Sequence, residues 1–156
     1  MLNTKRGVFS VVIIFIVLSC SGVEKRKDKP LKKVSINMVT HGQSTDPFWS
    51  VVSNGAKDAA KELGIDFYYQ SPQNFDMVTM SQIIDAVVST DPDGIIVSIP
   101  DVAALKKSIL AASKKDIPII VINAGSEIME EVDILTYIGQ SEYEAGMKAA
   151  KELIKY

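Results

Sequence analysis

The sequence predicts an α/β fold: a doubly wound, parallel, five-stranded sheet with helices on both faces. Two observations predict it. Strand-like and helix-like segments alternate five times without interruption after residue 33, and this order is typical of parallel strands joined by right-handed crossovers. Residues 95–99 and 117–122 are apolar on both faces apart from Ser98, as expected of strands that helices cover on both sides. The 156 residues, 47% of them hydrophobic, suffice for one such unit and additional segments.

The first residues are typical of a bacterial secretion signal. Lys5 and Arg6 precede a mostly apolar run over residues 8–18, which is too short to span a bilayer. The run ends in Ser19 and Cys20, an order that resembles the lipobox of bacterial lipoproteins, in which the cysteine becomes acylated. Because Cys20 is the only cysteine, it forms no internal disulfide.

We therefore expect a signal peptide over residues 1–19 and a lipidated Cys20. The lipid would anchor the protein in the cell envelope, on the periplasmic or extracytoplasmic side of the membrane. The alternative is an uncleaved membrane anchor with an incidental cysteine, which also leaves the remaining chain outside the cytoplasm. Residues 20–33 continue as a basic tether that suits solvent and contact with anionic lipid.

The charge of the remaining chain narrows the partner classes. Residues 34–156 hold nine lysines, no arginine and 17 acidic residues, which leaves a formal charge of −8. This charge argues against nucleic acid as a partner. The absence of arginine argues against phosphate and dicarboxylate ligands, which usually recruit its bidentate fork, although a helix N-terminus can bind an anion alone.

The first strand and helix are predicted from turn and capping residues. Residues 34–40 form a strand of mixed burial, and a polar loop follows. Asp46 fits the N-cap of a helix and Pro47 its first position. Apolar residues at steps of three and four continue this helix over residues 47–63, and Gly64 ends it.

The other elements repeat this alternation, with turn residues between them. We interpret the methionines of the second helix as core packing and residues 123–133 as a loop. The predicted strands are residues 65–69, 95–99, 117–122 and 134–139, and the predicted helices cover residues 77–88, a segment that Asp101 caps, and residues 142–155.

A ligand of such a sheet binds beyond the carboxyl ends of the strands, where the strand order reverses. The loops after the first, third and fourth strands are therefore the candidate site. Their side chains suit a carbohydrate, which offers hydroxyls to polar groups and C–H faces to aromatic rings. Helix capping by Asp46 and core packing of the aromatic residues are the structural alternatives. The candidate ligand-binding residues are Asp46, Phe48, Trp49, Ser98, Asn123 and, as a polar lining residue, His41.

Four segments resemble the ribose-binding type of periplasmic solute-binding proteins in order and spacing, over about residues 34–156. They read THGQSTDPFWSVVSNGAKDAAKELG, PDGIIVSIPD, IPIIVINAGS and YIGQSEYEAGMKAAKEL. The resemblance implies two similar α/β lobes joined by a hinge, a ligand closed between them, and delivery to the permease of an ABC importer. It also implies that residues 34–139 form the N-terminal lobe, and that residues 140–156 form the hinge and the first helix of a second lobe.

The resemblance assigns ligand contacts to Asp46, Phe48, Trp49 and Ser98. Asn123 and Ala124 depart from it, because many sugar-binding relatives have Asp followed by Arg there. The expected ligand is therefore a class of sugar-like small molecules, namely pentoses, hexoses or polyols. Since one lobe offers half a cleft, we expect this chain alone to bind sugar weakly or not at all.

Two other functions remain open. A lipoprotein of the same fold could present its ligand to a membrane receptor and act in sensing. A carbohydrate-active enzyme is less favoured, because the sequence has one histidine and lacks the phosphate-binding and metal-binding motifs of common enzymes. We therefore expect no enzymatic activity, no cofactor and no bound metal.

Overall fold

A computed structural model of the chain describes residues 33–43 and 45–156. The predicted signal peptide, the lipidated Cys20 and nearly all of the tether lie outside the described residues. The strand order is β2-β1-β3-β4-β5, and every neighbouring pair is parallel. In chain order the elements are β1 (Ser35–Val39), α1 (Pro47–Leu63), β2 (Asp66–Gln70), α2 (Met77–Ser89), β3 (Gly94–Val97), α3 (Val102–Ser113), β4 (Ile119–Ile122), the 3-10 helix η1 (Ser126–Glu130), β5 (Thr136–Ile138) and α4 (Glu142–Leu153).

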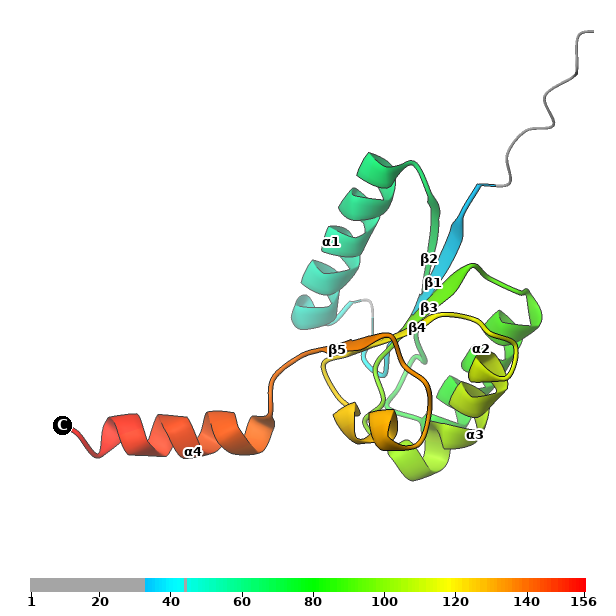
Figure 1. The fold of residues 1–156 in the computed structure, drawn as a ribbon. Coiled ribbons are helices and arrows are strands. Elements are labelled where there is room, and N and C mark those ends of the chain that lie inside the picture. Colours follow the sequence, from blue (N-terminus) through cyan, green and yellow to red (C-terminus); the bar gives the residue numbers. More distant parts are fainter. Residues whose placement is uncertain (1–32, 44) are drawn as a thin grey trace, which may run out of the picture. The chain divides into compact units, whose positions relative to one another are not determined.

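Helices cover both faces of the sheet, as predicted. Figure 1 shows α1 on one face and α2 and α3 on the other. The core lies on the α2 and α3 side, where Val39, Val97 and Val121 form one row across the strands and are 0% exposed. This row packs with Ile84 of α2 and Ile109 of α3 in one hydrophobic cluster. Burial of these branched side chains supplies most of the driving force for the sheet.

The helix boundaries follow the capping residues that the sequence predicts. The Asp46 carboxylate accepts hydrogen bonds from backbone N–H groups at the start of α1, and Pro47 occupies the first helical position. Gly64 ends α1 with a φ of 67°, a left-handed conformation that glycine adopts without strain. Asp101 caps α3 as predicted, and Asp76, which was not predicted from the sequence as a cap, caps α2.

One core segment departs from the prediction. The structure has a 3-10 helix over Ser126–Glu130, inside residues 123–133, which the sequence predicts as loop. Its Ile128 is 0% exposed and belongs to the same hydrophobic cluster as α3. The segment is too short to show helical periodicity, so only its packing reveals it.

The face that carries α1 is covered less completely. The cross-strand row Met38, Ile96 and Ile120 points to this face, and its last two members are only half-buried. Ile122 is also half-buried, and Ile138 on the edge strand β5 is 62% exposed. We call Ile96, Ile120, Ile122 and Ile138 the open face.

The open face explains a difference in α1. The predicted inward stripe of α1 includes Phe48 and Leu63, but these side chains are 54% and 71% exposed, and the buried residues are Trp49, Ser53 and Ala60. Phe48 and Leu63 line hollows whose walls include Ile96 and Ile120. The apolar stripe of α1 therefore borders the open face as well as the packed sheet.

The last helix, α4, contributes nothing to the core. Ser141 caps it, and none of its residues is buried, including the apolar positions that the sequence predicts on its inner face. Tyr143 and Leu153 are both more than three-quarters exposed, at 77% and 76%. None of the helices in the described part of the chain has the length and apolar content that a transmembrane span requires.

Candidate functional site

The strand order reverses between β1 and β3, because β2 lies on one side of β1 and the other strands follow on its other side. The loops after β1, β3 and β4 meet at this edge, as the sequence predicts. The backbone N–H of His41 donates to Ser98 Oγ at 3.0 Å. The backbone N–H of Ile99 donates to the Ala124 carbonyl oxygen at 2.8 Å. These bonds hold the three loops together.

A groove with a volume of about 560 Å³ opens beside this edge, on the face that carries α1. Three candidate ligand-binding residues line it, namely Phe48, Trp49 and Asn123. The other lining residues are Met38, Val52, Ile96, Ile120, Ile122, Ile138, Gly139, Gln140 and Glu142. The groove is therefore an apolar hollow with a few polar groups near the carboxyl ends of β4 and β5.

Phe48 and Trp49 form one wall of the groove although they are neighbours on α1. Their rings lie edge to face, with centroids 5.0 Å apart and an interplanar angle of 89°. Phe48 is 54% exposed, whereas Trp49 is 4% exposed. Phe48 thus offers ring surface to a ligand, while Trp49 is mostly enclosed by protein.

Asp46 does not line the groove. Its Oδ1 accepts hydrogen bonds from the backbone N–H groups of Phe48 at 2.8 Å and Trp49 at 3.4 Å. The carboxylate therefore fixes the first turn of α1 and, through it, the two aromatic residues of the groove wall.

Asn123 follows β4 directly and has a φ of 64°. Asparagine tolerates this left-handed conformation better than most residues do. The Asn123 carbonyl oxygen accepts a hydrogen bond from Tyr137 Oη at 2.7 Å, and its backbone N–H donates to the Ile138 carbonyl oxygen at 3.0 Å. The backbone of Asn123 is thus fixed by β5, and the residue lines the groove.

His41 and Ser98 lie behind the groove wall and bond to each other. His41 Nδ1 and Ser98 Oγ are 2.8 Å apart, and Ser98 is 0% exposed. Burial lowers the pKa of His41 below its usual value of 6.5, because desolvation disfavours the imidazolium. The imidazole also meets the Trp49 ring edge to face, at a centroid distance of 5.0 Å.

Several supporting residues were not predicted from the sequence. Thr40 is fully buried, and its Oγ1 lies 2.6 Å from Tyr69 Oη and 3.1 Å from the Gly42 carbonyl oxygen. Phe75, from the loop after β2, meets the His41 ring edge to face at 5.9 Å. The loop after β2 thus reaches the site, which the rule for strand reversals alone does not predict. A half-buried tyrosine usually finds a partner for its hydroxyl, and this tendency is the one signal that marks Tyr69.

Gln140 and Glu142 add polar groups to the groove from the segment after β5. Gln140 Nε2 donates to the Glu142 carboxylate at 3.1 and 3.2 Å. Tyr137 Oη also lies 3.1 Å from the Gln140 carbonyl oxygen, so its one proton is shared between the Asn123 and Gln140 carbonyls. The predicted hinge segment therefore contributes directly to the groove.

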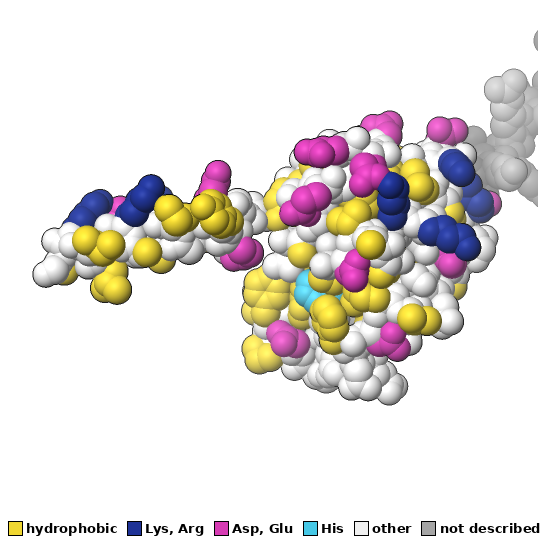
Figure 2. All heavy atoms as spheres, turned by 90° about the horizontal axis from the view of Figure 1, so that it is seen from below, with side chains coloured by type: hydrophobic (Ala, Val, Ile, Leu, Met, Phe, Trp, Pro, Cys, Tyr) yellow, Lys and Arg dark blue, Asp and Glu magenta, His cyan; other side chains and the backbone are white. Residues whose placement is uncertain are grey.

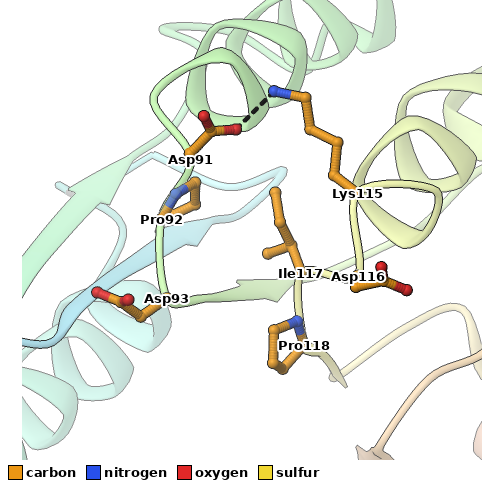
Figure 3. Close-up of a pocket in the computed structure, with 7 residues that line it drawn as sticks. All are labelled: Asp91, Pro92, Asp93, Lys115, Asp116, Ile117 and Pro118. Carbon is orange, nitrogen blue, oxygen red and sulfur yellow. Dashed lines mark hydrogen bonds and ion pairs between the residues drawn. The ribbon is translucent and has the colours of Figure 1, made fainter.

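A second hollow lies at the opposite, amino-terminal edge of β3 and β4 (Figure 3). In it, Lys115 Nζ forms an ion pair with Asp91 Oδ1 at 2.6 Å, and both side chains are substantially exposed. Asp93 Oδ2 accepts a hydrogen bond from the backbone N–H of Ser35. These groups serve turns at the amino ends of the strands, where open parallel sheets do not bind ligands.

The chemistry of the groove suits a neutral molecule with both C–H faces and hydroxyl groups. Its walls are aromatic and aliphatic, and Asn123 and Gln140 carry amides that both donate and accept hydrogen bonds. No lysine or arginine among the described residues lines it, so anionic groups would lack a counter-charge. In the same part of the chain, no cluster of His, Cys, Asp and Glu could hold a metal ion.

Comparisons with known proteins show the family and the fold. Residues 36–156 match the family described as the periplasmic binding protein domain. No curated protein sequence matches the chain.

Three solved structures illustrate the likeness. A periplasmic sugar binding protein of an ABC sugar transporter from Legionella pneumophila is 30% identical, with a TM-score of 0.74 over 79% of this chain and 45% of that chain. A carbohydrate transporter from Acidothermus cellulolyticus, in complex with myo-inositol, is 36% identical, with a TM-score of 0.69 over 75% and 40%. The glucose-galactose binding protein GanP from Geobacillus stearothermophilus is 28% identical, with a TM-score of 0.71 over 79% and 42%. The match thus spans less than half the length of these proteins.

Proposed function

Because this chain belongs to the periplasmic binding protein domain family, we propose that it is the N-terminal lobe of an extracytoplasmic receptor that captures a neutral sugar-like molecule for an ABC importer. One observation carries the proposal: Phe48, Trp49 and Asn123 line one groove beside the edge where the strand order reverses. The ligand class of pentoses, hexoses and polyols matches the groove, which combines ring surface with amides and lacks cationic side chains.

The assignment of roles follows from the positions of the side chains. Phe48 would stack on a C–H face of the sugar, and the Asn123 amide would bond a hydroxyl. Asp46 acts through the first turn of α1, whose N–H groups it already binds. Residues 34–139 would form the lobe, and residues 140–156 the hinge and the start of a second lobe.

A sugar titration tests the proposal. We expect the protein in its full encoded length to bind at least one of myo-inositol, glucose, galactose and arabinose, measured by calorimetry. Phe48→Ala and Asn123→Gly should weaken binding about tenfold, the cost of one lost hydrogen bond or stacking contact. Glycine is chosen at position 123 because the φ of 64° strains alanine.

The matched control is Asn54→Ala on the exposed side of α1, which should leave the affinity unchanged. Residues 21–156 alone should bind only with a Kd on the order of millimolar or weaker, because half a cleft leaves the ligand hydrated. Lack of binding to every neutral sugar tried by the full-length protein would contradict the proposed function.

We also propose that the receptor is a lipoprotein anchored through Cys20. The support is the sequence order alone, a charged segment, an apolar run and a cysteine after a small residue. Metabolic labelling with a fatty acid should mark the wild-type protein and not Cys20→Ser. A Cys20→Ser protein that still carries the label would refute the anchor.

A further inference from the structure

Four rings form a continuous row through the candidate site. Phe48 meets Trp49 at 5.0 Å, Trp49 meets His41 at 5.0 Å, and His41 meets Phe75 at 5.9 Å. Each successive pair is close to perpendicular, with interplanar angles of 89°, 81° and 80°. Edge-to-face pairs are the favourable geometry for aromatic rings. The row joins the groove wall on α1 to the loop after β2, and its one titratable ring lies in the middle.

The His41–Gly42 segment holds the Trp49 indole by two contacts. The imidazole packs against one part of the indole, and the Gly42 backbone packs against another. A Cβ atom on Gly42 would lie 1.8 Å from Trp49 Nε1, so only glycine permits this approach. Figure 2 shows the histidine at the molecular surface, surrounded by hydrophobic side chains. His41 therefore contacts Trp49 without lining the groove itself.

Ser98 decides which tautomer His41 adopts. Its Oγ accepts the backbone N–H of His41 at 3.0 Å and lies 2.8 Å from Nδ1. A hydroxyl has one proton to donate. If Nδ1 is unprotonated, Ser98 donates to it. If Nδ1 carries a proton, that proton points at Ser98, and the buried hydroxyl loses the one acceptor that it has among the described residues. This pairing favours the tautomer with the proton on Nε2.

We propose that His41 is a positioning residue of the groove: Ser98 holds its imidazole in the neutral Nε2–H tautomer, and the imidazole holds the Trp49 indole in the groove wall. The consequence for a ligand rests on the proposed function, because Trp49 matters to a sugar only if the groove binds one. At acid pH the imidazole would lose this position, because protonation of Nδ1 removes the acceptor of the Ser98 hydroxyl. Protonation also puts a charge among aromatic side chains.

Within residues 33–43 and 45–156, no ion pair involves the His41 imidazole. The groups that contact its imidazole, Ser98, Trp49 and Phe75, are uncharged. The titratable groups on the neighbouring elements each bond to backbone or hydroxyl groups, and none pairs with the imidazole in this described part of the chain. They are Asp46 (α1), Asp76 (α2), Asp101 (α3) and Tyr69 (β2). Desolvation, which lowers the pKa of His41, agrees with an imidazole that stays neutral at pH 7.

The sequence makes the test direct, because it contains one histidine and one tryptophan. Nitrogen NMR of the ligand-free chain at neutral pH should show a protonated Nε2 and an unprotonated Nδ1. Ser98→Ala should mix the two tautomers. A wild-type Nδ1–H tautomer, or a tautomer ratio that Ser98→Ala leaves unchanged, would overturn the proposal.

Trp49 fluorescence supplies the second readout, because a protonated imidazole in contact with an indole quenches its emission. The wild-type emission should fall with a midpoint below 6.5, and collisional quenching by acrylamide should rise over the same range as Trp49 loses its enclosure. His41→Phe keeps a ring, so it should keep Trp49 enclosed but abolish the pH dependence. His41→Asn keeps an acceptor for Ser98 and loses the ring, so it should expose Trp49 at every pH.

These outcomes separate the proposal from the function on which its consequence rests. Equal Trp49 accessibility in wild-type, His41→Phe and His41→Asn proteins would show that His41 does not position the indole. Sugar affinity in the full-length protein is measured independently, and His41→Asn should lower it several-fold. If the ligand-free readouts hold and no sugar binds, His41 still positions Trp49, and the proposed function fails.

Discussion

Individual backbone positions control how closely the loops of the site approach. Gly125 has a φ of 102° and follows the loop that carries Asn123. A Cβ atom at Gly125 would lie 2.4 Å from Ile99 Cβ and 2.6 Å from the Ile99 carbonyl oxygen. Because one of these neighbours is backbone, the contact cannot be relieved by a side-chain rotation. The loops after β3 and β4 can therefore meet only if position 125 is glycine.

Gly125→Ala should destabilise the protein by about 2 kcal/mol or more, through the left-handed strain and the collision together. Gly55→Ala is the matched control: Gly55 lies inside α1 and a Cβ atom there meets nothing within 4 Å. This change should stabilise the protein by up to about 1 kcal/mol, because alanine is the better helix former. Urea denaturation measures both, and a Gly125→Ala protein as stable as wild type would contradict the packing described.

His41 also makes stability depend on pH at the residue scale. Its pKa is lower in the folded protein than its ordinary value of 6.5, so the unfolded chain takes up the proton first as the pH falls. The stabilisation is therefore complete above 6.5 and is lost as the pH falls through the folded-state pKa. The free energy of unfolding of wild type should drop over this range more than that of His41→Phe, whose slope reports the carboxylates alone. Identical slopes would contradict the prediction.

At the scale of elements, short capping motifs set the boundaries of the helices that frame the site. Asp101 Oδ1 accepts the backbone N–H of Ala104 at 3.0 Å, at the start of α3 and directly after the loop that carries Ser98. The cap satisfies an N–H group that no helical carbonyl can reach. The same side chain therefore starts α3 and fixes where the loop after β3 ends.

Asp101→Ala should cost about 1 kcal/mol of stability, the usual value of an N-cap. Asp101→Asn should cost far less, because asparagine caps helices as well as aspartate does. Thermal unfolding followed by circular dichroism measures both variants. If the two variants are equally destabilised, the carboxylate acts by charge rather than as a cap.

At the scale of the whole described unit, the two faces of the sheet differ. The row Val39, Val97 and Val121 is fully buried under α2 and α3, whereas the open face shares its side of the sheet with α1 alone. The groove of the site has Ile96, Ile120, Ile122 and Ile138 among its lining residues. The candidate site and the open face therefore share one surface. Contiguous exposed apolar surface of this kind is unusual on soluble proteins.

The open face should bind a hydrophobic dye such as ANS under native conditions. Ile138→Glu should reduce the dye signal without lowering the melting temperature, since Ile138 is 62% exposed. Val51→Glu is the control, because Val51 is 72% exposed on α1 and lies outside the groove. An unchanged dye signal in Ile138→Glu would mean that the dye binds elsewhere.

The sequence by itself determined the alternation of strands and helices, the parallel sheet, and the ends of α1. These features depend on residues close together in the chain, such as Asp46, Pro47 and Gly64, and on apolar periodicity that local segments carry. The family follows from four ordered motifs, and the match over residues 36–156 confirms it.

Only the tertiary structure decided which candidate residues share a surface. It places Phe48, Trp49 and Asn123 in one groove. It pairs His41 with Ser98 behind the groove wall. It also brings Tyr69 of β2 and Phe75 of the following loop to the site. It also buries Ile128 of a segment predicted as loop. These contacts join residues tens of positions apart, so no local pattern encodes them, and they arise only when the sheet brings its carboxyl ends together.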